Sequence, residues 1–272
     1  MTLAGDSREL SALYVLRQFA MLRSSSQRFK IAGGMDLLPR AMASALGNLI
    51  RYDAPVVRVS RASATGTRIE YETGGRLEGM AASRIIFAVP LSTLRQIEIR
   101  PRLSGAKERA IEGPAYYPAT RFLLQSRSRF WNRAGLNGSA RTEQAEVWDC
   151  TYDRQGQDRG ILGATTGGAV GRKLLDMTEG DSLAAGVGLV AEVFPDIRST
   201  FEKGVAHRWP LERWSRGAFV TFRPGQMTSI MPDVSQLEDG VHFAGEHTSS
   251  WMGWMEGALE SGERAAHETL VA

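Results

Sequence analysis

Apolar and polar residues recur with two different periods along this chain, and the periods divide it into predicted helices and strands. Apolar residues recur at helical spacing in residues 7–23, which predicts an amphipathic helix. A short strand at Ile31 and a turn at Gly33–Gly34 are expected to lead into a second helix, which begins near Asp36 and ends at Gly47.

The period then changes to two, which is typical of β-strands. Strands are predicted over 56–60, 67–73 and 76–80, with a hairpin turn at Gly74–Gly75. Residues 84–90 form a continuous apolar run that ends in proline. Such a run predicts a strand that is covered on both faces.

Strands and helices are mixed in residues 91–235, and the chain then returns to a strand at 241–246 before a final helix. The predicted elements are a helix over 105–112, strands within 119–131, 145–152 and 160–168, a helix over 181–194 capped by Asp181 or Ser182, and a strand followed by an aromatic loop over 205–219.

This order predicts a mixed α/β (α+β) fold in which one region is inserted into another. We expect residues 31–90 and 236–272 to form two parts of one unit, with residues 91–235 inserted between them. Residues 1–30 are left as a helical remnant of the inserted region.

Composition and charge narrow the class of partner. The net charge of +3 arises from 33 basic and 30 acidic residues, and no dense basic run is interleaved with aromatic residues, so no nucleic-acid partner is predicted. No apolar run approaches the ~20 residues that span a bilayer, so no membrane partner is predicted either. Cys150 is the only cysteine, which excludes an intrachain disulfide and fits the cytoplasmic location that we expect.

Several motifs that suggest other chemistry fail on closer inspection. The glycine pattern at 186–191 lies inside a predicted helix, without the strand and turn that a nucleotide phosphate site needs. The glycine-rich stretch 163–173 resembles a phosphate loop but lacks its Gly-Lys-Ser/Thr ending. The four histidines show no ligand spacing, so no metal site is predicted; they are His207, His242, His247 and His267.

The strongest signal is the segment HFAGEHTSSWMGWMEGALESGERAA, residues 242–266. Gly253, Gly257 and Ser261 follow one another at intervals of four residues, and a glycine inside a helix costs about 1 kcal/mol relative to alanine. Either the helix packs tightly against a sheet, or a ligand approaches its backbone closely. A carboxylate directly after a strand, at Glu246, and a helix beginning near Trp254 favour the ligand, because free N–H groups there stabilise an anionic group.

This segment resembles the C-terminal flavin-binding signature of the flavin-dependent amine oxidase family, which includes monoamine oxidases and L-amino acid oxidases. Other stretches match the family in the same order, and the resemblance covers nearly all of the chain from about residue 30. They are GGMDLLPRAMA, APVVRVS, RFLLQSRSRFW and HRWPLERWSRGAFVTFRPGQM.

The resemblance implies a noncovalent FAD cofactor and a set of residues around it. Glu246 would accept hydrogen bonds from flavin hydroxyls. The helix start at Trp254–Met255 would direct N–H groups at the pyrimidine side of the flavin ring, where reduction places negative charge. The other implied cofactor-binding residues are Val56 against the adenine, Trp209 against the flavin, and Gly245 and Gly253 in the signature.

The resemblance also implies where the substrate lies. Trp254 and Phe219 match the two positions of the aromatic cage that holds the amine, and Trp214 matches an aromatic residue that lines the same cavity. Taken singly, each of these tryptophans is more commonly a core residue, and it is the combined order of the motifs that favours the cage.

Two positions depart from the family pattern. Ala218 replaces the cysteine that links the flavin covalently in some members, so we expect noncovalent binding. Arg121 stands where many members carry a lysine that holds a water near the flavin ring. An arginine cannot act as a neutral base, although it can position water or a carboxylate, so we assign Arg121 to the catalytic site and question efficient reoxidation by oxygen.

The family's opening strand, glycine-rich turn and helix, which hold the FAD diphosphate, have no counterpart here. We therefore expect this chain to be the C-terminal half of a two-domain FAD-dependent enzyme. In that assignment the N-terminal Rossmann half is absent, 31–90 and 236–272 belong to the FAD-binding domain, and 91–235 is the substrate domain. The partner would be a second polypeptide that carries the N-terminal half. A processed or truncated fragment is the second explanation, and a descendant that has lost catalysis is the third and less favoured one.

The implied reaction is oxidation of an amine or L-amino acid to the imine, with reduction of oxygen to hydrogen peroxide. Two alternatives remain at this point. One is a noncatalytic binding or regulatory subunit derived from an amine oxidase. The other is a flavin dehydrogenase or desaturase of the same fold that does not use oxygen.

Overall fold

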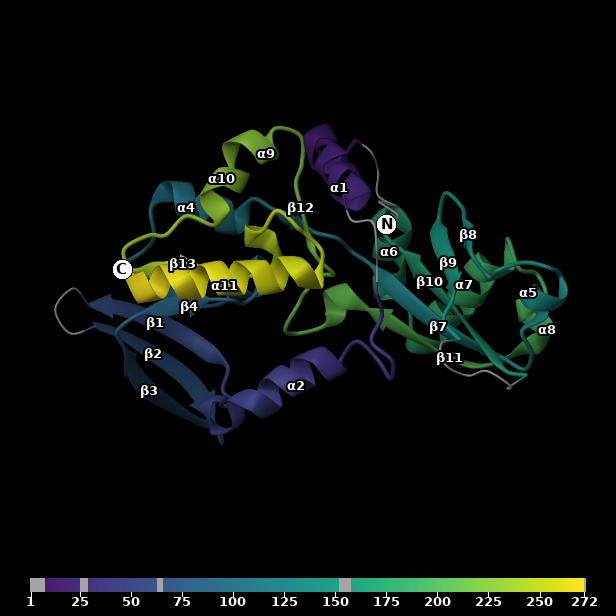
Figure 1. Cartoon of the computed structure of the whole chain (residues 1–272), viewed down its shortest axis with the longest axis horizontal. Coiled ribbons are helices and arrows are strands. Elements are labelled where there is room, and N and C mark those ends of the chain that lie inside the picture. The colour runs from purple at the N-terminus through teal and green to yellow at the C-terminus, as the bar shows by residue number, and fades with distance from the viewer. Residues whose placement is uncertain (1–7, 25–28, 63–65, 152–157, 272) are drawn as a thin grey trace. The chain divides into compact units, whose positions relative to one another are not determined.

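The computed structural model describes residues 8–24, 29–62, 66–151 and 158–271 and divides into two compact units (Figure 1). Of the described residues, the flanking unit contains those within 10–116 and 219–271, and the inserted unit contains those within 117–218 together with Arg8 and Glu9. The sequence predicted that the chain passes from one region to the other after residues 90 and 235. In the structure the chain passes between the two units after residues 116 and 218. The assignment of these segments to flavin-binding and substrate-binding domains stays a prediction.

The flanking unit contains most of the short helices and three small sheets. Its helices are α1 (Ala12–Ser24), α2 (Leu37–Leu46), α3 (Leu91–Leu94), α4 (Gly105–Glu112), α9 (Gln226–Ser229), α10 (Met231–Val234) and α11 (Met255–Val271). Its strands are β1 (Val56–Ala62), β2 (Gly66–Thr73), β3 (Arg76–Ala82), β4 (Ile85–Phe87), β5 (Glu98–Arg100), β6 (Ala115–Tyr116), β12 (Val220–Thr221) and β13 (Val241–Phe243).

The period-two pattern correctly predicted the largest of these sheets, whose strand order is β3-β2-β1-β5. Strands β2 and β3 pair antiparallel around a turn at Gly74 and Gly75, both of which have positive φ angles of 54° and 75°. Glycine adopts such angles without the steric penalty that a side chain incurs. Strand β5 adds to β1 in parallel.

Strands β4 and β13 form a separate parallel pair, and α11 lies along it (Figure 1). The prediction that residues 84–90 are covered on both faces is wrong for the described part of the chain. Ile85 and Phe87 are buried, but Ile86 between them is 38% exposed. Successive side chains of a strand point to opposite faces, so one face of β4 is covered here and the other is not.

A buried lysine fastens the loop after α10 to α4. Lys107 is buried, and its Nζ donates hydrogen bonds to the carbonyl oxygens of Asp233 and of Gln236, the latter at 2.6 Å. The same ammonium lies 4.0 Å from the ring centroid of Phe243 on β13, a cation–π contact. Lys107 therefore connects α4 to the loop after α10 and to β13, the strand at which the C-terminal signature begins.

The inserted unit is one antiparallel sheet with helices against it. Its strands are β7 (Thr120–Ser126), β8 (Ala140–Arg141), β9 (Ala145–Asp149), β10 (Gly160–Thr166) and β11 (Phe201–Arg208), and its helices are α5 (Phe130–Arg133), α6 (Gly168–Lys173), α7 (Glu179–Ala191) and α8 (Ile197–Thr200). The strand order is β11-β7-β10-β9-β8.

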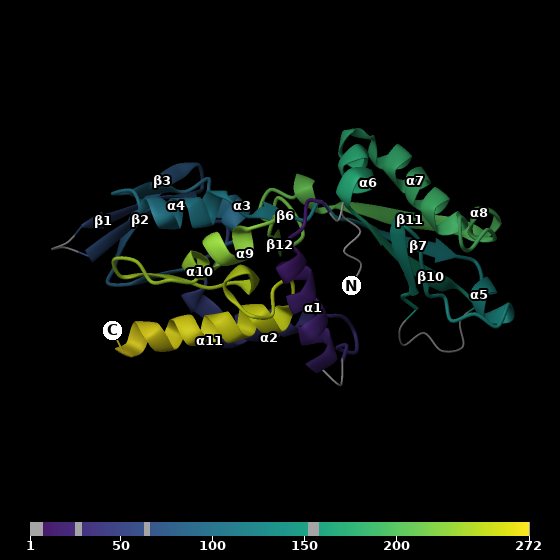
Figure 2. The same ribbon diagram turned by 90° about the horizontal axis from the view of Figure 1, so that it is seen from above.

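Helix α7 covers one face of this sheet (Figure 2). Phe122 and Leu124 of β7 point into the core on that side, where they pack with Leu162 and Val190. A Cβ on Gly186 would lie 2.3 Å from the Phe122 ring, so this glycine serves close packing of helix on sheet. The glycine pattern at 186–191 is thus part of α7, as predicted.

Three local predictions need correction. Helix α7 begins earlier than expected, because Thr178, and not Asp181 or Ser182, caps it by accepting a hydrogen bond from the Asp181 amide at 3.1 Å. Helix α1 begins at Ala12, five residues later than the apolar pattern suggested. No strand forms at Ile31, whose carbonyl instead accepts a hydrogen bond from the Gly34 amide in a turn.

Candidate functional site

The turn between β13 and α11 is organised around the carboxylate of Glu246. One carboxylate oxygen accepts a hydrogen bond from the Val220 amide at 3.0 Å, and the other accepts from the Gly253 amide at 2.7 Å. The two amides belong to segments far apart in the sequence. Glu246 therefore ties the start of β12 to the loop that precedes α11.

Burial raises the pKa of the Glu246 carboxyl, and the hydrogen bonds from the Val220 and Gly253 amides oppose that rise. The negative charge of Glu246 also acts on the phenols of Tyr14, which is buried, and Tyr116, which is half-buried. The pKa values of Tyr14 and Tyr116 are raised, first by burial and then by the negative charge of Glu246. Tyr14 donates a hydrogen bond to the Val220 carbonyl at 3.0 Å, and Tyr116 accepts one from the Leu91 amide at 2.8 Å.

The sequence predicted Glu246 as an acceptor for flavin hydroxyls. Its contacts are compatible with that role, because two carboxylate oxygens offer about four acceptor positions and the two backbone amides occupy only two. No sequence pattern identified Tyr14 and Tyr116 as members of this cluster. Tyr14 looked like one more apolar position of an amphipathic helix.

Two glycines allow the backbone to turn here. Gly245 has a φ of 117°, and a Cβ on it would lie 2.4 Å from the His247 ring. Gly253 has a φ of 79° and lies beside the Phe219 ring, with 3.5 Å from its Cβ position to the nearest ring atom. The predicted residues Gly253 and Phe219 are therefore brought together, next to Trp254.

The start of α11 presents hydrogen-bond donors. Among the described residues, the amides of Met255 and Glu256 have no acceptor, whereas the Gly257 amide donates to the Trp254 carbonyl at 3.1 Å. The first N–H groups of a helix carry a partial positive charge. The prediction that the helix begins at Trp254–Met255 is confirmed, since α11 starts at Met255.

The glycines inside α11 do not share one explanation. A Cβ on Gly257 would lie 2.3 Å from the Trp251 carbonyl oxygen, so this glycine lets the loop fold back on its own helix. A Cβ on Gly262 would meet nothing within 4 Å. Of the two explanations that the sequence left open, close packing within the chain accounts for Gly257.

Side chains of α11 fix the helix to the strand and turn before it. The Ser261 hydroxyl accepts a hydrogen bond from the Gly245 amide at 2.9 Å. Arg264 donates to the Phe243 carbonyl at 2.9 Å and to the Thr248 hydroxyl at 3.0 Å. The position and direction of the helix start are therefore set by side chains about two turns along the same helix.

The remaining predicted residues lie elsewhere. Val56 is half-buried at the first position of β1, beside a bulge. The other three belong to the inserted unit. Arg121 lies on β7, Trp209 contacts the His207 ring edge-on with 4.4 Å between ring centroids, and Trp214 is exposed beneath the Arg213 guanidinium.

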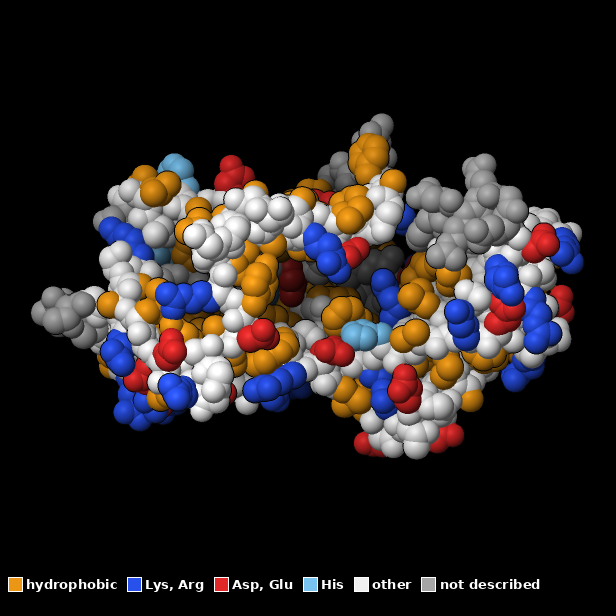
Figure 3. Space-filling view, turned by 90° about the horizontal axis from the view of Figure 1, so that it is seen from below, with side chains coloured by type: hydrophobic (Ala, Val, Ile, Leu, Met, Phe, Trp, Pro, Cys, Tyr) orange, Lys and Arg blue, Asp and Glu red, His pale blue; other side chains and the backbone are white. Residues whose placement is uncertain are grey.

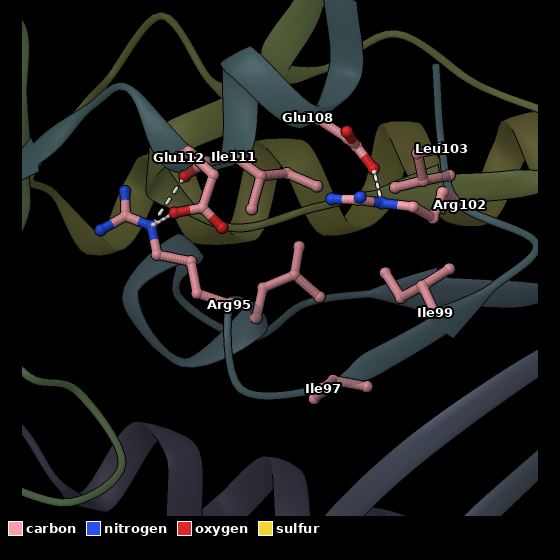
Figure 4. A pocket seen from close by; sticks show the side chains of 9 residues that line it. Arg95, Ile97, Ile99, Arg102, Leu103, Glu108, Ile111 and Glu112 are labelled. Carbon is pink, nitrogen blue, oxygen red and sulfur yellow. Dashed lines mark hydrogen bonds and ion pairs between the residues drawn. The ribbon is translucent and has the colours of Figure 1, made fainter. Parts of the chain in front are cut away.

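A pocket of about 230 Å³ lies apart from this turn, between α4 and the segment that leads into β5 (Figure 4). Its floor is apolar, and its rim charges are already paired: Arg102 donates to Glu108 at 2.7 Å, and Arg95 lies 3.6 Å from Glu112. It contains none of the predicted site residues.

In the described part of the chain no cluster of His, Cys, Asp and Glu side chains could hold a metal ion. No helix there has the length and apolar character needed to cross a bilayer.

Comparison with known proteins decides the family. The model of the flavin-containing amine oxidoreductases matches residues 1–270. The chain belongs to this family. It is 31% identical over 267 residues to the putative L-amino-acid oxidase YobN of Bacillus subtilis (strain 168), covering 95% of this chain and 56% of that protein. It is 26% identical over 271 residues to the L-amino-acid oxidase of Demansia vestigiata, covering 97% of this chain and 52% of that protein.

Two solved amine oxidase structures share the fold. Cyclohexylamine oxidase from Brevibacterium oxydans IH-35A matches with a TM-score of 0.82 at 20% identity, over 98% of this chain and 61% of its own. Putrescine oxidase matches with a TM-score of 0.79 at 23% identity, over 88% and 53%. The predicted mixed α/β fold of this family is confirmed, and the chain spans about half the length of the curated relatives it matches.

Alanine substitutions at the two glycines of α11 are expected to change the stability of the protein in opposite directions. Gly257→Ala should destabilise the protein by about 1–3 kcal/mol, because the new methyl group overlaps the Trp251 carbonyl. Gly262→Ala should stabilise it by up to ~1 kcal/mol, because the site is open and alanine favours the helix. Chemical denaturation of both variants measures the difference. Equal effects would contradict the assigned packing.

Burial of His247 predicts a pH dependence of stability. Burial lowers the pKa of His247 to about 4, so the unfolded chain binds a proton at this residue near pH 6.5 while the folded chain does not. The free energy of unfolding should therefore fall by up to about 3 kcal/mol from this residue as the pH drops from 6.5 to 4.

Denaturation of the His247→Gln variant at several pH values between 4 and 7 isolates this contribution. The variant should show a flatter pH profile than the unchanged protein. The control variant His267→Gln, altered at an exposed position of α11, should keep the original slope. A variant at His247 with an unchanged slope would refute the prediction.

Proposed function

We propose that this chain takes part in flavin-dependent oxidation of an amine or L-amino acid to the imine, with oxygen reduced to hydrogen peroxide. The observation that carries the proposal is the turn from β13 to α11. It offers free amide donors at Met255 and Glu256 and a carboxylate at Glu246 that keeps acceptor capacity. Membership of the flavin-containing amine oxidoreductases supports a flavin at this turn.

The arrangement fits the group that the family implies. The helix start would stabilise negative charge on the flavin ring. Glu246 would accept hydrogen bonds from flavin hydroxyls with the lone pairs that its two amide partners leave available. When bound, the flavin would supply the acceptor for a hydride from the carbon that carries the amine.

The side chains of this turn would bind and orient the substrate. Phe219 and Trp254 are the proposed walls of the amine site, and Phe219 lies beside the Gly253 backbone. Aromatic walls exclude water and favour a neutral amine, whose lone pair is needed for oxidation. Noncovalent binding of the flavin is proposed because Ala218 replaces a linking cysteine.

Flavin absorbance tests the proposal. The assembled protein should be yellow, should lose its colour on anaerobic addition of the substrate and should release all of its flavin on denaturation. Glu246→Gln should lower the flavin content, because an amide group cannot accept from both backbone N–H groups and from the flavin. The control Glu263→Gln, at an exposed position of α11, should retain the flavin.

Each failure has a distinct meaning. A colourless assembly that takes up no FAD would support a noncatalytic subunit. A yellow assembly that substrate reduces, but that releases no peroxide in air, would indicate a dehydrogenase.

We also propose that the flanking unit binds a second polypeptide that carries the N-terminal half of the flavin fold. Helix α2 has no buried residue, and Met42 and Leu46 are exposed four residues apart, which places them on one face of the helix. Leu16 and Phe19 of α1 are exposed as well, and Figure 3 shows hydrophobic side chains interspersed with charged ones on one face of the molecule. Because the chain covers 56% of YobN, the uncovered half is the occupant that we propose.

Charged substitutions on α2 test this surface. The double variant Met42→Glu, Leu46→Glu should remain folded, because both positions are exposed, but should fail to co-purify with the N-terminal half from the same organism. Leu136→Glu, at an exposed leucine of the inserted unit, is the matched control and should still co-purify. A complex that survives the double variant, or a face that mediates only self-association, would contradict the proposal.

A further inference from the structure

Helix α1 buries polar side chains and exposes apolar ones. Tyr14 and Gln18, four residues apart on one face of the helix, are buried. Leu13, Leu16 and Phe19 are 50%, 64% and 56% exposed. A helix of a globular protein normally packs through its apolar stripe. The face by which α1 packs on the rest of the flanking unit is instead marked by polar side chains.

These two polar side chains bind backbone carbonyl groups of distant segments. The Tyr14 hydroxyl donates a hydrogen bond to the Val220 carbonyl at 3.0 Å, and Gln18 donates through Nε2 to the Met252 carbonyl at 3.1 Å. The two carbonyls lie 206 and 234 residues away in the sequence. Helix α1 therefore connects β12 to the loop before α11, beside which it lies in Figure 1 and Figure 2.

The same two segments hold Glu246. Val220, whose carbonyl accepts from Tyr14, donates its own amide to one Glu246 carboxylate oxygen at 3.0 Å. The Met252 carbonyl and the Gly253 amide belong to one peptide group, and this amide donates to the other carboxylate oxygen at 2.7 Å. Each segment is thus held by α1 through a carbonyl oxygen and by Glu246 through an amide N–H.

The contact from Gln18 fixes the direction of the Gly253 amide. A peptide group is planar, so a hydrogen bond that holds the Met252 oxygen also orients the N–H group on the other side of the same plane. Gly253 has a φ of 79°, and glycine has more backbone freedom than any other residue. Hydrogen bonds in a chain also polarise one another, so the contact makes the amide a stronger donor to Glu246.

Gln18 makes this contact although its other polar atom has no partner. Its Oε1 is buried and forms no hydrogen bond within the described part of the chain. Turning the amide group over would bring Oε1 against the Met252 oxygen, which is also an acceptor. Buried polar groups nearly always have partners, and proteins break such local rules mainly where function requires it. The donor of Gln18 is therefore the group that this position needs.

We propose that Gln18 and Tyr14 are positioning residues of the flavin turn. They hold the Met252–Gly253 peptide and Val220, and these in turn hold the Glu246 carboxylate and the start of α11. The inference rests on the proposed function. Neither side chain has to touch the flavin, because each acts through a backbone segment.

Hydrogen exchange of single amides, followed by NMR in the full chain without flavin, tests the two contacts separately. In Gln18→Met the Gly253 amide should exchange about tenfold faster, while the Val220 amide keeps its rate. In Tyr14→Phe the Val220 amide should be the one that exchanges faster. A general loss of stability would instead speed both amides in both variants.

The Gln18→Met variant is expected to remain folded. Methionine has a similar length and removes the unpartnered oxygen together with the donor, so the midpoint of chemical denaturation should change little. The matched control is Gln226→Met. The Gln226 side chain donates to the Gly113 carbonyl at 2.9 Å elsewhere in the same unit, so its loss should leave the exchange of the Gly253 and Val220 amides unchanged.

FAD titration of the assembled protein extends the test to the cofactor. The Kd for FAD should rise about fivefold in Gln18→Met, because a misdirected Gly253 amide displaces Glu246 and the helix start, and it should stay constant in Gln226→Met. Equal acceleration of both amides, or an unchanged Kd in Gln18→Met, overturns this inference while flavin uptake and turnover stand. The selective exchange pattern in a protein that takes up no FAD would overturn the proposed function alone.

Discussion

The pair of hydrogen bonds that Glu246 accepts is the constraint on which the candidate site depends. A single carboxylate receives one backbone amide from β12 and another from the loop before α11. Hydrogen bonds to a charged group contribute about 1.5–3 kcal/mol each, and a buried carboxylate without them would be strongly disfavoured. If the loop before α11 did not close on Glu246, the buried carboxylate would lose one of its two hydrogen-bond donors. This requirement sets where α11 begins.

The same interaction explains why the neighbouring residues are so restricted. Gly253 must donate its amide to Glu246 while holding a positive φ, and Gly257 must leave room for the Trp251 carbonyl. Ser261 and Arg264 then anchor the helix to the backbone around Gly245 and Phe243. Small and polar residues at these positions are thus required by the closure of the loop, whatever ligand the helix start binds. A small-residue pattern in such a helix is accordingly weak grounds for a ligand when taken alone.

Sequence reasoning succeeded where the signal is local. The hairpin around Gly74 and Gly75, helix α4 and the start of α11 follow from residues within a few positions of one another. It failed where a distant segment decides the outcome. Ile86 is 38% exposed although its neighbours Ile85 and Phe87 are buried, and a continuous apolar run cannot reveal which segments will pack against each face of a strand.

The register of the inserted sheet shows the same limit in a different form. Arg121, Thr165 and His207 are more than 40 residues apart in sequence, and none belongs to a recognisable local motif. Only the antiparallel register of three strands places them side by side. The family resemblance selected Arg121 by its position before the Phe-Trp pair, but it could not supply the two partners, because partners on adjacent strands are specified by pairing and not by spacing.

Exposed apolar side chains occur in both units. Helix α2 has an apolar face, yet none of its residues is buried. In the inserted unit, Leu123 of β7 and Val205 of β11 are exposed as well. Exposed apolar surface forgoes about 25 cal/mol for each Å² that burial would remove from water, and large exposed patches mark surfaces that bind a partner or a ligand. Helix α2 belongs to the same unit as the Glu246 turn, so the surface proposed for a second polypeptide is carried by the unit that carries the candidate flavin site.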